Sequence, residues 1–217
     1  MISKPPKPLI GYSDITALHT ALGEKAGIVT IHAPMLFNFA DEKKMTAYTK
    51  SQFLTGLTEK NAVGEILLPR NGKLKTLVEG EAEGIIVGGN LAVLTSLVGT
   101  PYELDGTGAL LLLEDVDERP YRLDRMLYQL YQNGLLNRVN GILFGDFTDC
   151  KNKKPGGLTF EEVLEHYAKL SGKPAVMGVP AGHEKNNMFL PMGVHAKMTA
   201  DSNGKARLII DESAFKS

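Results

Sequence analysis

Residues 7–16 read Lys-Pro-Leu-Ile-Gly-Tyr-Ser-Asp-Ile-Thr, an apolar run that breaks into a helical pattern at a serine. The apolar pair before Gly11 predicts the end of a buried strand, and the residues from Ile15 onward predict a helix. Ser13 then occupies a sharp strand-to-helix turn, where the amide of Asp14 can stabilise an oxyanion. The nucleophile-elbow pattern has glycine where this chain has Ile15, so the alternative is that Ser13 or Asp14 simply caps the helix.

The composition is that of an ordinary globular protein. The 217 residues are 43% hydrophobic and carry 24 basic against 25 acidic side chains. This balance argues against nucleic acid or an anionic membrane as a partner, and no apolar run approaches the roughly 20 residues that span a bilayer. Cys150 is the single cysteine, which rules out an internal disulfide and a cysteine-based zinc site. With no signal-peptide pattern and no nucleotide-binding motif, we expect a cytoplasmic protein without a cofactor.

The pattern of predicted secondary structure changes near residue 58. Residues 1–58 combine the strand and helix at the elbow with a β-rich stretch at 29–32 and a helical pattern at 43–57, as in two βα units of a parallel sheet. Residues 59–217 contain shorter strands and hairpins. We therefore predict an α/β protein in which the remnant of a parallel-sheet domain (1–58) precedes a mixed α/β domain (59–217). Because a central strand needs neighbours on both sides, we also expect the N-terminal domain to be incomplete.

Local patterns predict several individual elements. Asn71-Gly72 between apolar stretches predicts a hairpin of 64–69 with 74–79, and Asn203-Gly204 predicts a terminal hairpin. Thr159 and Glu162 form a capping box for the helix that follows, and Pro120 is expected to open a helix that runs through Leu130 to Asn133. The helix over 14–26 is expected to turn these residues inward: Ile15, Leu18, Leu22 and Ala26.

Two polar positions follow further strands. The buried strand predicted at 109–113 ends in the acidic residues 114–118, and His183 follows a predicted strand at 174–179. Because ligand chemistry gathers at the carboxyl ends of strands in open α/β sheets, both positions are candidate site residues. The alternative for the acidic residues is a solvated loop before the next helix.

Asn90 follows Gly-Gly and a predicted strand over 82–87. Its simplest interpretation is the N-cap of the next helix, a position that asparagine favours.

The order Ser13, Glu114, His183 is that of nucleophile, acid and base in the α/β-hydrolases. An imidazole can take the proton of a serine hydroxyl near neutral pH, and a carboxylate orients the imidazole and stabilises its cation. Glu114 is preferred to Asp115 because it comes first after the buried strand.

Five motifs in this order resemble the LD-carboxypeptidase family, which also contains the microcin C self-immunity hydrolases. They are Ile-Gly-Tyr-Ser-Asp-Ile-Thr at 10–16, Gly-Gly-Asn-Leu at 88–91, Leu-Leu-Glu-Asp-Val at 112–116, Gly-Asp-Phe at 145–147, and Gly-His with Leu-Pro-Met-Gly at 182–193.

The resemblance implies that Ser13 is the nucleophile, His183 the general base and Glu114 its orienting acid. It implies that the Asp14 amide is an oxyanion donor and that Asn90 belongs to the substrate pocket. It also implies a cytoplasmic homodimer that needs no metal and removes the terminal D-alanine from murein tetrapeptides in peptidoglycan recycling.

The chain departs from the family in lacking the α/β region upstream of the elbow, which contributes to the pocket and the oxyanion hole. Without that region, the carboxypeptidase activity is expected to be impaired, and an inactive murein-peptide-binding or dimerisation remnant is one alternative. A second alternative is an immunity-type hydrolase of a nucleotide peptide. Asp117, where an arginine would suit the immunity-type substrate, favours muropeptides.

Overall fold

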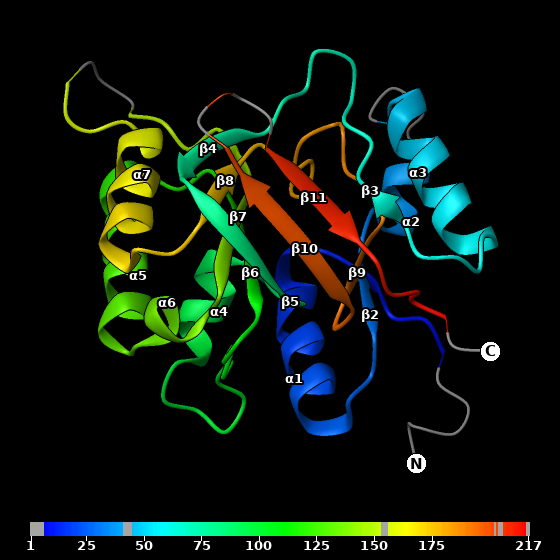
Figure 1. Ribbon diagram of the computed structural model, residues 1–217, viewed down its shortest axis with the longest axis horizontal. Helices are drawn as coiled ribbons and strands as arrows, with labels where there is room; N and C mark the ends of the chain where they lie inside the picture. Colours follow the sequence, from blue (N-terminus) through cyan, green and yellow to red (C-terminus); the bar gives the residue numbers. More distant parts are fainter. Residues whose placement is uncertain (1–6, 41–44, 153–155, 202, 204–205, 216–217) are drawn as a thin grey trace.

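The computed structural model describes residues 7–40, 45–152, 156–201, 203 and 206–215 (Figure 1). Its helices are the 3-10 turn η1 (Ser13–Ile15), α1 (Thr16–Ala26), α2 (Leu36–Phe39), α3 (Ala47–Thr58), α4 (Leu91–Leu97), α5 (Pro120–Gln132), α6 (Leu135–Arg138) and α7 (Phe160–Ser171). Its strands are β1 (Ile10–Gly11), β2 (Thr30–His32), β3 (Gly64–Glu65), β4 (Lys75–Val78), β5 (Gly80–Asn90), β6 (Leu110–Val116), β7 (Gly141–Thr148), β8 (Ala175–Met177), β9 (Leu190–Met192), β10 (His195–Ala200) and β11 (Arg207–Ile210). This is the mixed α/β architecture that the sequence predicts.

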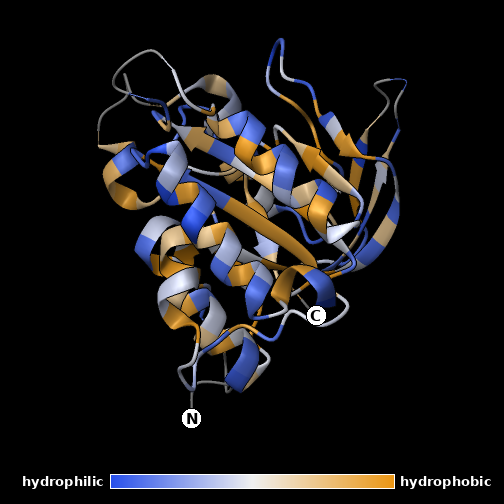
Figure 2. Cartoon of the chain, turned by 90° about the vertical axis from the view of Figure 1, so that its left-hand side faces the viewer, coloured by the Kyte–Doolittle hydropathy of each residue, from blue (hydrophilic) through white to orange (hydrophobic). Residues whose placement is uncertain are grey.

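The larger sheet has the order β3-β11-β10-β5-β6-β7-β8-β4 within the described residues. Its centre, β5 to β8, is parallel, and the strands outside it pair antiparallel. Helices α4, α5, α6 and α7 lie together beside one face of the parallel strands (Figure 1). Figure 2 shows a mostly hydrophobic strand running between helices that carry polar residues outward. Burial on both faces explains why β6 and β7 read as almost continuous apolar runs.

The smaller sheet joins the two ends of the chain. Strand β1 pairs in parallel with β2, and β2 pairs antiparallel with β9, which lies more than 150 residues later. A strand from the C-terminal part of the chain therefore extends the sheet formed by the N-terminal βα units.

Several local predictions are confirmed. The side chain of Asn90 caps α4 by accepting the amide of Val93, and Pro120 opens α5. Thr159 and Glu162 form the predicted capping box of α7. Strands β10 and β11 form the terminal antiparallel pair. Each of these features depends on residues close in sequence.

The hairpin predicted around Asn71-Gly72 is wrong. The turn itself forms, with the amide of Gly72 donating to Pro69 O at 2.7 Å and Asn71 at φ 67°. The flanking strands nevertheless pair elsewhere, β3 with β11 and β4 with β8, at opposite edges of the large sheet. Pairing with strands distant in sequence thus overrides the turn signal.

The predicted inner face of the first helix is also wrong. In α1 the buried residues are Thr16, His19 and Thr20, whereas Leu18 is 45% exposed. Two of these residues are buried with hydrogen-bond partners. His19 Nδ1 lies 2.8 Å from Thr30 Oγ1 and its Nε2 lies 3.0 Å from Gly11 O, while Thr16 Oγ1 accepts the amide of Asn90. The second helical pattern, predicted over 43–57, begins at Ala47 with Thr46 as its N-cap, and residues 43 and 44 lie outside the described residues.

No helix in the described part of the chain is both long enough and apolar enough to cross a membrane.

Candidate active site

Ser13 lies on a strained turn between β1 and the helix. Its φ is 61°, in the left-handed region that residues other than glycine rarely adopt. The turn is tight, because a methyl group at Gly11 would lie 2.7 Å from the side chain of Ile15. Such strain at a strand-to-helix turn is typical of a nucleophile elbow and is not needed for a simple helix cap.

Glu114 lies within β6 and not in a solvated loop, so that alternative is wrong. The strand continues to Val116, and the Glu114 side chain is completely buried. Its neighbour Asp115 is also buried and points to the opposite face of the strand, as alternation requires. Two consecutive acidic residues thus have separate environments.

A β-bulge brings the histidine loop over Glu114. Between β6 and β7 the register passes from Leu113↔Phe144 to Asp115↔Phe147, so two residues of β7 oppose Glu114. The first of them, Gly145, leaves room for the backbone of Ala181, since a methyl group there would lie 2.3 Å from Ala181 O. The second, Asp146, donates its amide to Ala181 O at 2.9 Å.

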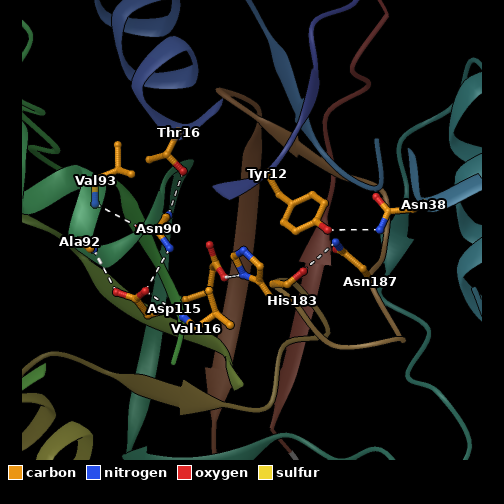
Figure 3. A network of polar contacts seen from close by, with 12 residues as sticks. Tyr12, Thr16, Asn38, Asn90, Ala92, Val93, Asp115, Val116, His183 and Asn187 are labelled. Atoms are coloured by element: carbon orange, nitrogen blue, oxygen red, sulfur yellow. Dashed lines mark hydrogen bonds and ion pairs between the residues drawn. The ribbon is translucent and has the colours of Figure 1, made fainter. Parts of the chain in front are cut away.

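The structure brings His183 and Glu114 together. His183 Nδ1 lies 2.8 Å from Glu114 Oε2, and their side chains are 17% and 0% exposed (Figure 3). Since a carboxylate can only accept, Nδ1 carries the proton, which leaves Nε2 of the neutral ring free to act as a base.

The loop that carries His183 is held by α3. The hydroxyl of Thr49 donates to Lys185 O at 2.7 Å and accepts the amide of Asn187 at 3.0 Å. The side chain of Asn187 donates to Gly182 O at 2.9 Å. Sequence reasoning missed Thr49 and Asn187, because their partners lie about 140 residues away or within an irregular loop. The Asn-Asn pair that follows Gly-His-Glu-Lys was the one available signal.

Tyr12 connects the elbow to the histidine. Its ring centroid lies 4.9 Å from that of His183 in an edge-on arrangement, and its hydroxyl accepts a hydrogen bond from Asn38 Nδ2 at 3.2 Å (Figure 3). These three residues line a cavity of about 220 Å³, to which Asn187 and Phe37 also contribute. In the described part of the chain, no residue hydrogen-bonds the Ser13 hydroxyl, and Asp14 is exposed.

Asn90 belongs to a structural network beside these residues. Its side chain accepts from Val93 N and donates to Asp115 Oδ1 at 3.2 Å, and its own amide donates to Thr16 Oγ1 (Figure 3). Asp115 also accepts the amide of Ala92, while burial raises its pKa to about 6. Both polar atoms of the Asn90 side chain are thus engaged, and its role in a substrate pocket stays a prediction.

Close packing explains why Gly89, the second residue of the Gly-Gly-Asn motif, is a glycine. A methyl group at this position would lie 2.5 Å from Thr16 Oγ1, and its φ of +133° disfavours other residues. The glycine lets α1 approach β5 closely enough for Thr16 to accept the Asn90 amide.

Two buried histidines lie behind the elbow. Burial lowers the pKa of His19 to about 4 and, more strongly, that of His32 to about 3. The His32 ring is completely buried, and neither of its nitrogens has a hydrogen-bond partner among the described residues. Both rings are therefore neutral at pH 7. The described residues contain no cluster of three or more histidine, cysteine or acidic side chains suited to a metal ion.

Comparison with known proteins places this arrangement in a family. The family model described as LD-carboxypeptidase C-terminal domain matches residues 83–198, more than half of the chain, and that of the LD-carboxypeptidase N-terminal domain matches residues 1–33. The chain belongs to the LD-carboxypeptidase family. The boundary predicted between 58 and 59 falls between the two matched segments and stays a prediction.

Individual LD-carboxypeptidase relatives agree with this assignment. A probable murein peptide carboxypeptidase of Bacillus subtilis is 42% identical, over 100% of this chain and 67% of its own length. The crystal structure of muramoyltetrapeptide carboxypeptidase from Oxalobacter formigenes matches with a TM-score of 0.82 at 30% identity, over 98% of this chain and 70% of that one. The microcin C7 self-immunity protein MccF, solved with glutamyl sulfamoyl guanosine, matches with a TM-score of 0.87 over 99% of this chain and 70% of that one. At 24% identity, this last likeness shows the fold alone. The chain thus spans about two thirds of the length of these relatives.

Proposed function

We propose that this chain carries the catalytic residues of a serine LD-carboxypeptidase that removes the terminal D-alanine from murein tetrapeptides. The contact between His183 and Glu114 at 2.8 Å, with the His183 ring packed against Tyr12, the residue before the strained Ser13, is the observation that carries the proposal. The names of the relatives from Bacillus subtilis and Oxalobacter formigenes support the substrate class.

In the proposed mechanism, Ser13 Oγ attacks the carbonyl carbon of the bond between the third residue and D-alanine, while His183 Nε2 takes the hydroxyl proton. Glu114 holds the ring through Nδ1 and stabilises the imidazolium. The Asp14 amide donates to the oxyanion that forms on the carbonyl oxygen.

Collapse of this intermediate breaks the carbon–nitrogen bond, and the imidazolium gives its proton to the departing amine. Water then attacks the acyl carbon as His183 takes its proton, and the imidazolium gives this proton to Ser13 Oγ as the ester bond breaks and the shortened peptide leaves as its carboxylate.

Release of D-alanine from a purified murein tetrapeptide tests the proposal. We expect release by this chain, loss of release in Ser13→Ala, and no change in Ser96→Ala, whose hydroxyl lies on the exposed surface of α4 and bonds Val93 O. Folding of each variant is checked by circular dichroism. Release that survives in Ser13→Ala would refute the serine mechanism, and cleavage of an acyl-sulfamoyl nucleotide but not of the tetrapeptide would favour the immunity-type alternative.

The family resemblance also leads us to propose a cytoplasmic homodimer. Sedimentation equilibrium tests the oligomeric state, and a single species at the mass of one chain would contradict it.

A further inference from the structure

Asp146 lies directly opposite Glu114, yet the proposed mechanism does not use it. The β-bulge sets Gly145 and Asp146 together against Glu114, and bulges of this kind commonly redirect a side chain next to an active site. Gly-Asp-Phe at 145–147 was one of the sequence motifs, and packing explains its glycine and its core phenylalanine but not Asp146.

The side chain of Asp146 and the carboxyl group of Glu114 both lie beside Gly182. A methyl group at Gly182 would lie 2.8 Å from Cβ of Asp146 and 3.1 Å from Oε2 of Glu114. Both side chains therefore border the same small space, next to the residue that precedes His183.

Each of these carboxyl groups has one oxygen without a partner. Among the described residues, neither Glu114 Oε1 nor Asp146 Oδ2 has a hydrogen-bond partner, and both atoms are buried. A buried oxygen without a donor is costly, and two ionised carboxylates this close repel each other. A proton on one of the carboxyl groups removes both penalties, because a protonated carboxyl is a donor.

The surroundings of Asp146 favour the protonated form there. Glu114 faces it from β6, Glu184 from the loop after β8, and Tyr48 from α3. Burial, followed by the charges of Glu184 and Glu114, raises the pKa of Asp146 to about 8, although a backbone hydrogen bond from Glu184 opposes the shift.

We propose that Asp146 is a positioning residue that, as a neutral acid, donates its proton to Oε1 of Glu114 and so fixes the carboxylate whose other oxygen holds His183. Asp146 itself touches neither substrate nor His183 in this scheme. The effect of Asp146 on catalysis rests on the proposed function, whereas the protonation state of Asp146 does not.

Three variants test the kinetic consequence in the pH profile of kcat/KM for tetrapeptide cleavage. In the unaltered chain, kcat/KM is expected to fall as the pH rises through about 8, because ionised Asp146 no longer donates. Asp146→Ala is expected to lower kcat/KM by about 10- to 100-fold at pH 7, the usual effect of losing a hydrogen bond to a charged group. Asp146→Asn retains a donor that cannot ionise, so it should recover most of that loss and lack the alkaline decline.

Asp115→Asn is the matched control. It alters a buried carboxyl on the opposite face of β6, and the alkaline decline should persist in it. A merely structural role for Asp146 predicts that the alanine and asparagine variants share the pH profile of the unaltered chain, and this result would overturn the proposal.

Infrared spectroscopy tests the protonation state without any substrate. The difference spectrum between the unaltered chain and Asp146→Asn at pH 6 should contain the carbonyl band of a protonated carboxyl, and that band should disappear near pH 8. The same result is expected in a Ser13→Ala background. If the band is present but no D-alanine is released, the proposed function fails and the Asp146 assignment stands. If no band is present at pH 6, Asp146 is ionised and the assignment is wrong.

Discussion

At the scale of single residues, two consecutive acidic side chains of the candidate site have different roles. Glu114 and Asp115 are consecutive and both buried, but β6 sends them to opposite faces of the sheet. Glu114 accepts from His183, whereas Asp115 accepts from Asn90 and from the first turn of α4. In the proposed mechanism, catalysis and the anchoring of α4 thus depend on different carboxylates.

Exchanging each carboxylate for its amide separates these duties. Glu114→Gln should lower kcat by about a thousandfold or more, because the amide favours the wrong imidazole tautomer. Asp115→Asn should leave kcat nearly unchanged but lower the free energy of unfolding by about 1–3 kcal/mol, since it leaves a buried donor unpaired. Steady-state kinetics and urea unfolding measure the two effects. Equal loss of kcat in both variants would mean that the assignment of the acid to Glu114 is wrong.

At the scale of elements, one irregularity in β7 positions the histidine. The bulge and Gly145 together allow the backbone at Ala181 to approach β7, which carries the following loop across Glu114. The polar groups of α3 then hold that loop in place. A regular β7 would leave His183 displaced from its acid.

Gly145→Ala should therefore impair the site through the backbone. Its methyl group would overlap Ala181 O, so we expect a loss of about 1–3 kcal/mol in unfolding free energy and about a hundredfold in kcat/KM from displacement of His183. Gly23→Ala is the control, since a methyl group on that α1 residue meets nothing within 4 Å and should stabilise the helix by about 1 kcal/mol. Normal kcat/KM in Gly145→Ala would show that the close approach at Ala181 is not required.

At the scale of the whole molecule, buried neutral histidines link folding to pH. The pKa of His19 is lowered from 6.5 to about 4, so the unfolded chain takes up its proton first as the pH falls. The contribution of His19 to stability is therefore complete above pH 6.5 and is lost progressively between pH 6.5 and 4. Asp115 and Asp146, whose pKa values are raised, act in the opposite direction, because folding disfavours their charged forms.

Comparing the unaltered chain with His19→Gln separates the pH dependence of stability due to His19 from that due to these carboxyl groups. The difference in unfolding free energy between the unaltered chain and the variant should decrease by on the order of 3 kcal/mol from pH 7 to pH 4. Urea unfolding at a series of pH values measures this difference. A difference that stays constant over this range would show that His19 is not held neutral by the fold.

Features that depend on residues close in sequence could be predicted without the structure. The caps at Asn90 and Thr159, the start of α5 and the terminal β10–β11 pair follow from residues a few positions apart, and local chemistry suffices to choose them. The sequence also supplied the site residue types at strand ends, because strand termini are readable from apolar runs.

Contacts between segments distant in sequence could not be predicted and are known from the folded chain. Folding separated β3 from β4, turned the polar face of α1 inward, and brought Glu114, Asp146 and His183 to one place from three separate segments. These outcomes depend on the free energy of contacts between residues tens to more than a hundred positions apart. A turn dipeptide or an apolar stripe contributes too little to outweigh such contacts, and so cannot predict them.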